Sequence, residues 1–299
     1  MGIFNKKETI TQNMAFMAIM AGINVLLSLL AGFVPVSAIF LVIFLPLVST
    51  LVEVFCKDKY YPIYAFATIG LSFAVSFWNY EATVFYLIPA ILIGFTFGFT
   101  LKRNVSPIWA ILINTILQTL LTIGSLYLIK LIFEEDMYER IPQILHFDIT
   151  PAYEVFYIPM LFVVSLIEIV LSYIVVSNEI KKFGYEYQNG IGEKAFLAIT
   201  TMSITLAGVG IEFLSHSAGY ICLFIAIYLF VFIVIDEAIN KKYALLIIDS
   251  VALVIGLLLF QLLNQVLPAF IGGMFFGLAP LVTSCTYLIH YLLIRKTNK

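Results

Sequence analysis

Charged residues are scarce in this sequence. They make up only 11% of its 299 residues, whereas 62% are hydrophobic. A soluble globular protein usually has about 25% charged residues to cover its surface. The scarcity therefore excludes a soluble enzyme and a disordered chain. The hydrophobic residues instead predict an all-α polytopic membrane protein with about ten transmembrane helices, each of about 20 residues.

Cysteine and histidine are also rare, with three of each, and the net charge is −2. The cysteines Cys56, Cys222 and Cys285 lie far apart and form no CxxC pair, which argues against a metal site, a redox dithiol or a disulfide framework. GxSxG, HExxH and P-loop motifs are missing as well. We therefore expect no enzyme and no cofactor, and the small net charge gives no sign of nucleic-acid binding.

Polar residues divide the chain into ten apolar segments. These are 12–33, 36–56, 60–78, 82–101, 107–132, 152–178, 194–213, 217–239, 243–264 and 268–294. When the loops are placed alternately on the two sides, all basic residues except Lys130 and Arg140 fall on the side of the N-terminus. Because cytoplasmic loops carry the excess of Lys and Arg, we expect a multi-pass cell-membrane protein with both termini in the cytoplasm.

Short motifs recur between the first four and the last four segments. Ala15-Phe16-x-Ala18-Ile19, Ser37-Ala38 and Pro89-Ala90-x-x-x-Gly94-x-x-Phe97-Gly98 return as Ala195-Phe196-x-Ala198-Ile199, Ser217-Ala218 and Pro268-Ala269-x-x-x-Gly273-x-x-Phe276-Gly277. The nearly constant offset predicts a parallel duplication of spans 1–4 as spans 7–10, an arrangement known in transporters. The alternative is that tightly packed helices share small residues and proline by chance.

Polar residues inside the apolar segments are the strongest functional signal, because a charge in hydrocarbon is expensive and usually faces a cavity or a partner. Glu168 lies near the middle of span 6, with Ser165 and Ser172 on the same helical face. Span 5 carries a polar stripe at helical spacing, formed by Asn114, Gln118, Thr122 and Ser125. Two interpretations stay open. The stripes form hydrogen bonds between helices with Glu168 protonated, or they form a binding site for a small solute or ion.

Aromatic and polar residues cluster where spans 3 and 4 meet on the expected outer side. Trp78, Asn79 and Glu81 join the two spans, and Tyr86 follows. Aromatic residues at this level usually form an interfacial belt, and the alternative is the mouth of a pocket for a flat ring. The one long external loop, about 133–151, is amphipathic. It predicts a linker on the outer membrane surface or a lid over an outward-facing pocket.

Small residues at i, i+4 spacing let helices approach closely. Gly94 with Gly98 on span 4, and Gly273 with Gly277 on span 10, predict such packing, with a broken helix beside a cavity as the alternative. On span 1 the small residues are Ala15, Ala18 and Gly22. These three predict a contact either within the chain or with a partner helix.

Acidic residues also occur toward the expected inner ends of several spans. Asp249 and His290 lie at a similar depth on spans 9 and 10, so we expect them to pair, either as a structural contact or as a proton relay. Glu53, Asp236 and Glu237 lie beside lysines at the inner boundary, and a solvated position explains them.

The first six spans resemble the substrate-binding S component of energy-coupling factor transporters. The resemblance is carried by the six-span unit of about 180 residues, by Ala15, Ala18 and Gly22, and by the segment from Phe85 to Arg103. It implies that the small residues of span 1 contact a coupling membrane subunit with ATPases, and that the outer half binds a vitamin or similar solute. Family members usually stop at six spans, and the ten-span length is more similar to the YybS-like membrane proteins.

The leading hypothesis is therefore a solute-binding or translocating subunit with two membrane units, 1–182 and 183–299. Its substrate-binding residues are predicted to be Trp78, Asn79, Glu81, Tyr86, Gln118 and Glu168. Partner proteins would supply energy for uptake of a small nutrient. The alternatives are a non-transporting scaffold subunit of a membrane complex and an ion-coupled secondary transporter.

Overall fold

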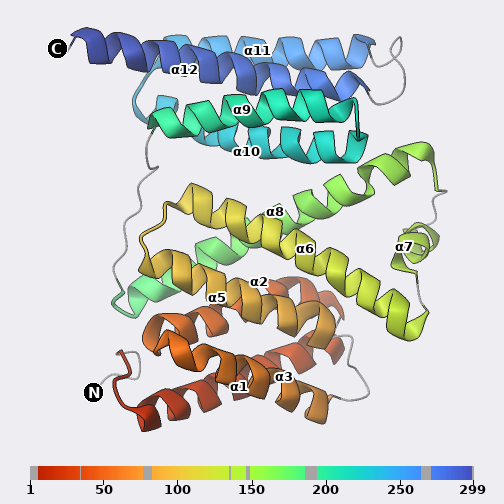
Figure 1. Ribbon diagram of the computed structural model, residues 1–299, viewed down its shortest axis with the longest axis vertical. Helices are drawn as coiled ribbons and strands as arrows, with labels where there is room; N and C mark the ends of the chain where they lie inside the picture. The colour runs from red at the N-terminus through yellow and green to blue at the C-terminus, as the bar shows by residue number, and fades with distance from the viewer. Residues whose placement is uncertain are drawn as a thin grey trace. The chain divides into compact units, whose positions relative to one another are not determined.

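The expected apolar segments are helical in the computed structural model (Figure 1). The structure describes residues 6–33, 35–76, 83–134, 136–145, 149–185, 194–263 and 271–297. These ranges contain eleven α-helices and no strand. The all-helical class is therefore confirmed for the described part of the chain.

The helices follow the expected segments closely. Their bounds are α1 (Ile10–Phe33), α2 (Pro35–Phe55), α3 (Tyr61–Val75), α5 (Ile88–Lys102), α6 (Pro107–Phe133), α7 (Met137–Leu145), α8 (Pro151–Lys182), α9 (Lys194–Glu212), α10 (His216–Ile239), α11 (Tyr243–Leu263) and α12 (Leu278–Thr297). Three short helices of other types are the 3-10 helices η1 (Asp58–Tyr60) and η4 (Ile271–Gly277) and the π-helix η3 (Thr83–Leu87).

Among the described residues, eight helices are long and apolar enough to cross a membrane. Many large apolar side chains on these helices and in the turns beside them are exposed, for example Leu214 at 89% and Leu131 at 80% exposure. In water such surfaces would be costly, whereas lipid covers them without penalty. The protein is thus a multi-pass membrane-embedded helical protein. Ten crossings and cytoplasmic termini stay predictions.

The long loop that we expect on the outer side contains the helix α7, which is seen nearly end-on beside the end of α6 in Figure 1. Between α6 and α7, Lys130 Nζ lies 2.5 Å from Asp136 Oδ2. This ion pair lowers the pKa of the Asp136 carboxyl, which is also lowered by the backbone N–H of Tyr138. A short helix set crosswise to the spans agrees with the expected surface linker, and a role as a lid stays untested.

The chain forms two compact units, which we call unit 1 (residues 1–147 and 164–189) and unit 2 (148–163 and 190–299). The expected division into units 1–182 and 183–299 stays a prediction. Residues 151–163, which begin α8, group with unit 2. Their contacts explain the grouping. Ser217 Oγ donates to the carbonyl oxygen of Val155 at 2.7 Å, and the rings of Phe156 and Tyr220 lie 4.6 Å apart.

In unit 1, α2 packs against both α1 and α5, and α5 packs against α6. The two glycines of α5 face α2 at close range. A Cβ atom at Gly94 would lie 2.8 Å from the carbonyl oxygen of Pro46, and one at Gly98 would overlap the side chain of Glu53. The packing interpretation of these glycines is therefore confirmed.

In unit 2, α9 and α10 pack together and α12 contacts both, with η4 leading into α12. A Cβ atom at Gly277 would lie 2.9 Å from Thr205 Cγ2 and 3.2 Å from Leu223 Cδ2, so this glycine also serves close packing.

Residues matched by the proposed duplication sit in different environments in the two units. Phe16 is buried whereas Phe196 is 54% exposed, and Ala198 is buried whereas Ala18 is exposed. The matched helices α1 and α9 thus turn different faces to their neighbours. The duplication stays a prediction.

Candidate solute-binding site

The polar stripe of α6 faces the interior of unit 1. Asn114, Gln118 and Ser125 are all buried, at 0%, 8% and 6% exposure. Asn114 Oδ1 accepts a hydrogen bond from Thr96 on α5, and Ser125 Oγ donates to the carbonyl oxygen of Val84 at 3.3 Å. The stripe therefore joins α6 to α5 and to η3.

Gln118 connects the polar stripe of α6 to α8. Its Nε2 atom donates to Glu168 Oε2 at 3.3 Å. Glu168 is half-buried, and Ser165 and Ser172, one turn before and after it, are buried at 2% and 1% exposure. The facing stripes predicted from helical spacing thus meet through Gln118 and Glu168.

A small cavity lies beside this pair. Its lining includes the polar side chains Tyr86, Gln118, Glu168 and Ser172, together with apolar groups from α2, η3, α5 and α8. Its volume is about 10 Å³, close to the least that holds one water molecule. The site is therefore closed around its polar groups in this structure.

A larger groove lies next to the cavity, between η3, α5 and α6. Its volume is about 500 Å³, within the usual range of sites for small molecules. The lining is apolar except for Ser125 and Tyr127. The groove lies on the exposed face of α6 at Leu120, Tyr127 and Leu131, and it offers room for an apolar body, which the closed cavity does not.

One short segment lines both spaces. Phe85 and Tyr86 line the cavity, Val84 and Ile88 line the groove, and Pro89 contributes to both. Val84, Phe85 and Tyr86 belong to the π-helix η3. A π-helix is rare and often occurs at functional sites, and η3 lines both spaces.

Three of the six predicted site residues, Trp78, Asn79 and Glu81, lie outside the described residues. The other three, Tyr86, Gln118 and Glu168, line one cavity. Their proximity matches the predicted site, and solute binding by them stays a prediction.

The predicted partner-contact residues of α1 share an outward face of unit 1. Ala15 and Ala18 are exposed, and a Cβ atom at Gly22 would meet nothing within 4 Å. Packing within unit 1 therefore does not account for these small residues.

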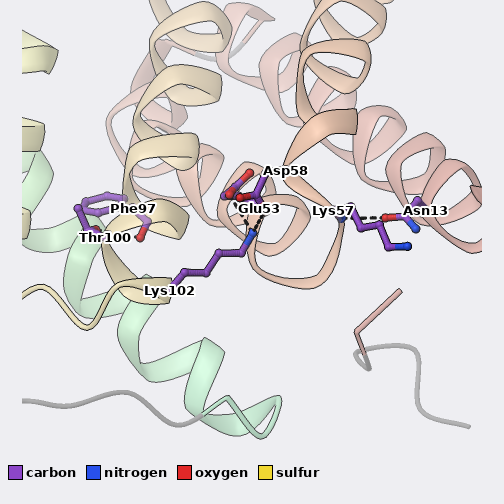
Figure 2. A network of polar contacts seen from close by, with 7 residues as sticks. All are labelled: Asn13, Glu53, Lys57, Asp58, Phe97, Thr100 and Lys102. Carbon is purple, nitrogen blue, oxygen red and sulfur yellow. Dashed lines mark hydrogen bonds and ion pairs between the residues drawn. The ribbon is translucent and has the colours of Figure 1, made fainter. Parts of the chain in front are cut away.

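A second polar assembly lies at one end of unit 1 (Figure 2). Lys102, at the end of α5, contacts Glu53 Oε1 at 2.9 Å and also pairs with Asp58. The expected solvated position of Glu53 is wrong, because its side chain is fully buried, against α5 at Gly98. The Lys102 ammonium lowers the pKa of the Asp58 carboxyl, chiefly through their hydrogen bond.

The same end of unit 1 gathers the basic N-terminal and α2–α3 segments. The backbone N–H of Lys7 donates to the carbonyl oxygen of Phe55 at 2.8 Å, and that of Lys57 donates to Asn13 Oδ1 at 2.9 Å (Figure 2). Lys102, the last residue of α5, also lies at this end because it forms an ion pair with Asp58. These lysines thus lie at one end of unit 1, and the side of the membrane that this end faces stays a prediction.

Unit 2 also buries acidic residues that we expected to be solvated. Asp236 and Glu237 are 3% and 0% exposed. The expected pair of Asp249 with His290 is wrong as well, because Asp249 Oδ1 accepts its hydrogen bond from Thr283 at 2.7 Å. The sequence does not show the direction in which each helix face points, and that direction decides which side chains are buried.

One buried cluster was missed by the sequence analysis. The Asn24 amide donates to Ser49 Oγ at 2.8 Å and to the Tyr64 hydroxyl at 2.7 Å, which joins α1, α2 and α3. All three residues are nearly inaccessible, with Asn24 and Ser49 at 0% and Tyr64 at 1% exposure. Asn24 is followed by Ser28, and Tyr64 by Thr68 and Ser72, at i, i+4 spacing, so helical periodicity could have indicated these buried faces.

Comparison with known protein families, curated proteins and solved structures finds no match for this chain. The described residues contain no group of three His, Cys, Asp or Glu side chains that could hold a metal ion. Function is therefore argued from the chemistry of the cavity and its surroundings.

Proposed function

We propose that this protein is the solute-binding and translocating subunit of a membrane uptake system, similar to an S component, for a small nutrient. The observation that carries the proposal is the Gln118–Glu168 hydrogen bond beside a cavity inside the membrane. Polar groups at this depth are costly unless they are paired or bind something. The pair uses one oxygen of Glu168 and one donor of Gln118, and their other polar atoms are available to a solute.

The proposed solute combines an apolar body with one hydrogen-bonding end. The apolar groove of about 500 Å³ accommodates the body. Gln118 and Glu168 bind the polar end once η3 moves and joins the groove to the cavity. Tyr86, carried by η3, then stacks on the solute or covers it, as expected for an aromatic residue in a small-molecule site.

Mass spectrometry of the intact protein released from mild detergent tests this proposal. The wild type is expected to retain a small molecule, and Glu168→Gln is expected to retain less of it at equal folding. Glu179→Gln is the matched control, since Glu179 lies on the same helix, three residues from its partner Lys182 and away from the cavity. Equal retention by the wild type and Glu168→Gln would remove Glu168 from the site.

We also propose that a partner membrane subunit with ATPases supplies the energy. The exposed face of α1 with Ala15, Ala18 and Gly22 supports a helix contact there. Small residues let a partner helix approach closely.

A non-transporting scaffold subunit is the alternative. It predicts that no small molecule is retained and that partners still copurify with Glu168→Gln. An ion-coupled secondary transporter is favoured by a separate observation, the buried acidic residues of unit 2. Uptake by the purified chain alone in vesicles, driven by a proton or sodium gradient, distinguishes it from both other functions.

A further inference from the structure

Two carboxyl groups on neighbouring helices of unit 2 are buried together. Glu237, in the last turn of α10, is 0% exposed, and Asp249, in the second turn of α11, is 2% exposed. The two carboxyl groups lie within range of direct interaction with each other. Two carboxylates at that range repel each other strongly when both are ionised.

The neighbouring cation is already paired with a third acid. Lys194 Nζ, on α9, contacts Asp236 Oδ1 at 2.8 Å, and the Tyr287 hydroxyl, on α12, donates to Asp236 Oδ2 at 2.7 Å. Lys242 lies with its ammonium 4.7 Å from the centre of the Tyr287 ring and interacts with Glu237 only through space. The charge of Asp236 is thus neutralised, whereas Glu237 and Asp249 have no ion-pair partner among the described residues.

The hydrogen bonds of the two groups are also incomplete. Asp249 Oδ1 accepts from Thr283 at 2.7 Å. Asp249 Oδ2 and both carboxyl oxygens of Glu237 are buried without a hydrogen-bond partner. Ionised carboxylates only accept hydrogen bonds, so these oxygens can bond to each other only through a proton. Buried charges without a partner would otherwise be strongly unfavourable.

We propose that Glu237 and Asp249 together bind one exchangeable proton, so that unit 2 contains a proton site separate from the solute site of unit 1. One carboxyl group carries the proton and its O–H donates to the carboxylate of the other. Thr283 completes the site by donating to Asp249 Oδ1, the oxygen that does not face the shared proton. Loss of the proton to water leaves two facing carboxylates and opens the pair.

Infrared spectroscopy of the protein in lipid nanodiscs tests the shared proton, because protonated carboxylic acids have their own carbonyl band. At neutral pH, Glu237→Gln and Asp249→Asn are each expected to lose the intensity of one acid. The double variant is expected to lose no more than either single variant. Asp236→Asn is the control and should lose nothing, since Asp236 is ion-paired with Lys194.

Three results would overturn the proposal. The first is that the intensity losses of the two single variants add up in the double variant. The second is that neither single variant loses intensity. The third is that sodium at constant pH removes the band, which would assign the site to a metal cation.

A milder variant keeps the test decisive if a carboxyl variant fails to fold. Thr283→Val removes the hydroxyl that stabilises the Asp249 carboxylate. The proton should then leave at a pH higher by roughly half to one unit, the effect of one hydrogen bond. Thr286→Val is the matched control on the same helix, because Thr286 bonds only to the backbone at Thr283. Equal titration of the Thr283→Val variant and the wild type would contradict the site.

Discussion

Gly98 lies directly against the side chain of Glu53, at the point where α5 crosses α2. The missing side chain leaves room for Glu53 to extend along α5 and to reach Lys102 Nζ at 2.9 Å. A helix crossing and a buried ion pair thus depend on one glycine.

Gly98→Ala is expected to destabilise the protein by about 1–3 kcal/mol, because the added methyl group overlaps the Glu53 side chain in a packed interface. Thermal unfolding in detergent measures the change. Gly22→Ala is the matched control, since nothing lies within 4 Å of its added methyl group. The control should be neutral or stabilising by up to about 1 kcal/mol through helix propensity. Equal effects of the two variants would contradict the packing.

Lys102→Met is expected to destabilise the protein by roughly 3 kcal/mol, because it leaves the fully buried Glu53 carboxylate without its partner. The double variant Lys102→Met with Glu53→Gln should recover most of this loss. Unfolding free energies of the four proteins form a double-mutant cycle. A coupling near zero would show that the buried pair contributes nothing.

Acid should weaken the same assembly through Asp58. Lys102 holds the pKa of Asp58 below its ordinary value of 3.8. The stabilisation is therefore fully present above that value and is lost as the pH falls through the lower folded-state pKa. We expect the stability difference between wild type and Asp58→Asn to shrink between about pH 5 and about pH 3. A difference that stays constant over this range would exclude the linkage.

Much of unit 1 follows from the sequence because its signals are periodic. Asn114, Gln118 and Ser125 recur at helical spacing, so they share one face, and that face is buried. Glu168 is conspicuous as an acid in an apolar span. Its contact with Gln118 follows from placing two polar faces next to each other in a membrane.

The remaining contacts depend on helix rotation, which isolated polar residues do not reveal. Asp249 was expected to pair with His290 because both lie at a similar depth, yet it bonds to Thr283. Glu53 was expected in solvent because it lies near a lysine-rich boundary, yet Lys102 covers it from α5. Sequence position gives depth along a span, and packing decides the partner.

The exposed face of α1 leads to a prediction about assembly. Gly22→Leu should leave the thermal stability of the isolated protein unchanged, because its side chain enters open space in unit 1. Copurification of partner subunits from native membranes should fall strongly, since the bulky side chain blocks close helix approach. Ile63→Leu, at a half-exposed position on α3, is the control. Unchanged copurification of partners with Gly22→Leu would remove this face from the interface.

The proposed function depends most on the binding of a solute by Gln118 and Glu168. Equilibrium binding of the copurified small molecule to the protein in nanodiscs measures this directly, with Glu168→Gln and Gln118→Leu compared with Glu179→Gln. Loss of one good hydrogen bond should weaken binding at least about tenfold in the first two variants, while Glu179→Gln binds as the wild type does. Wild-type affinity in both cavity variants, with all proteins folded, would contradict the proposed site.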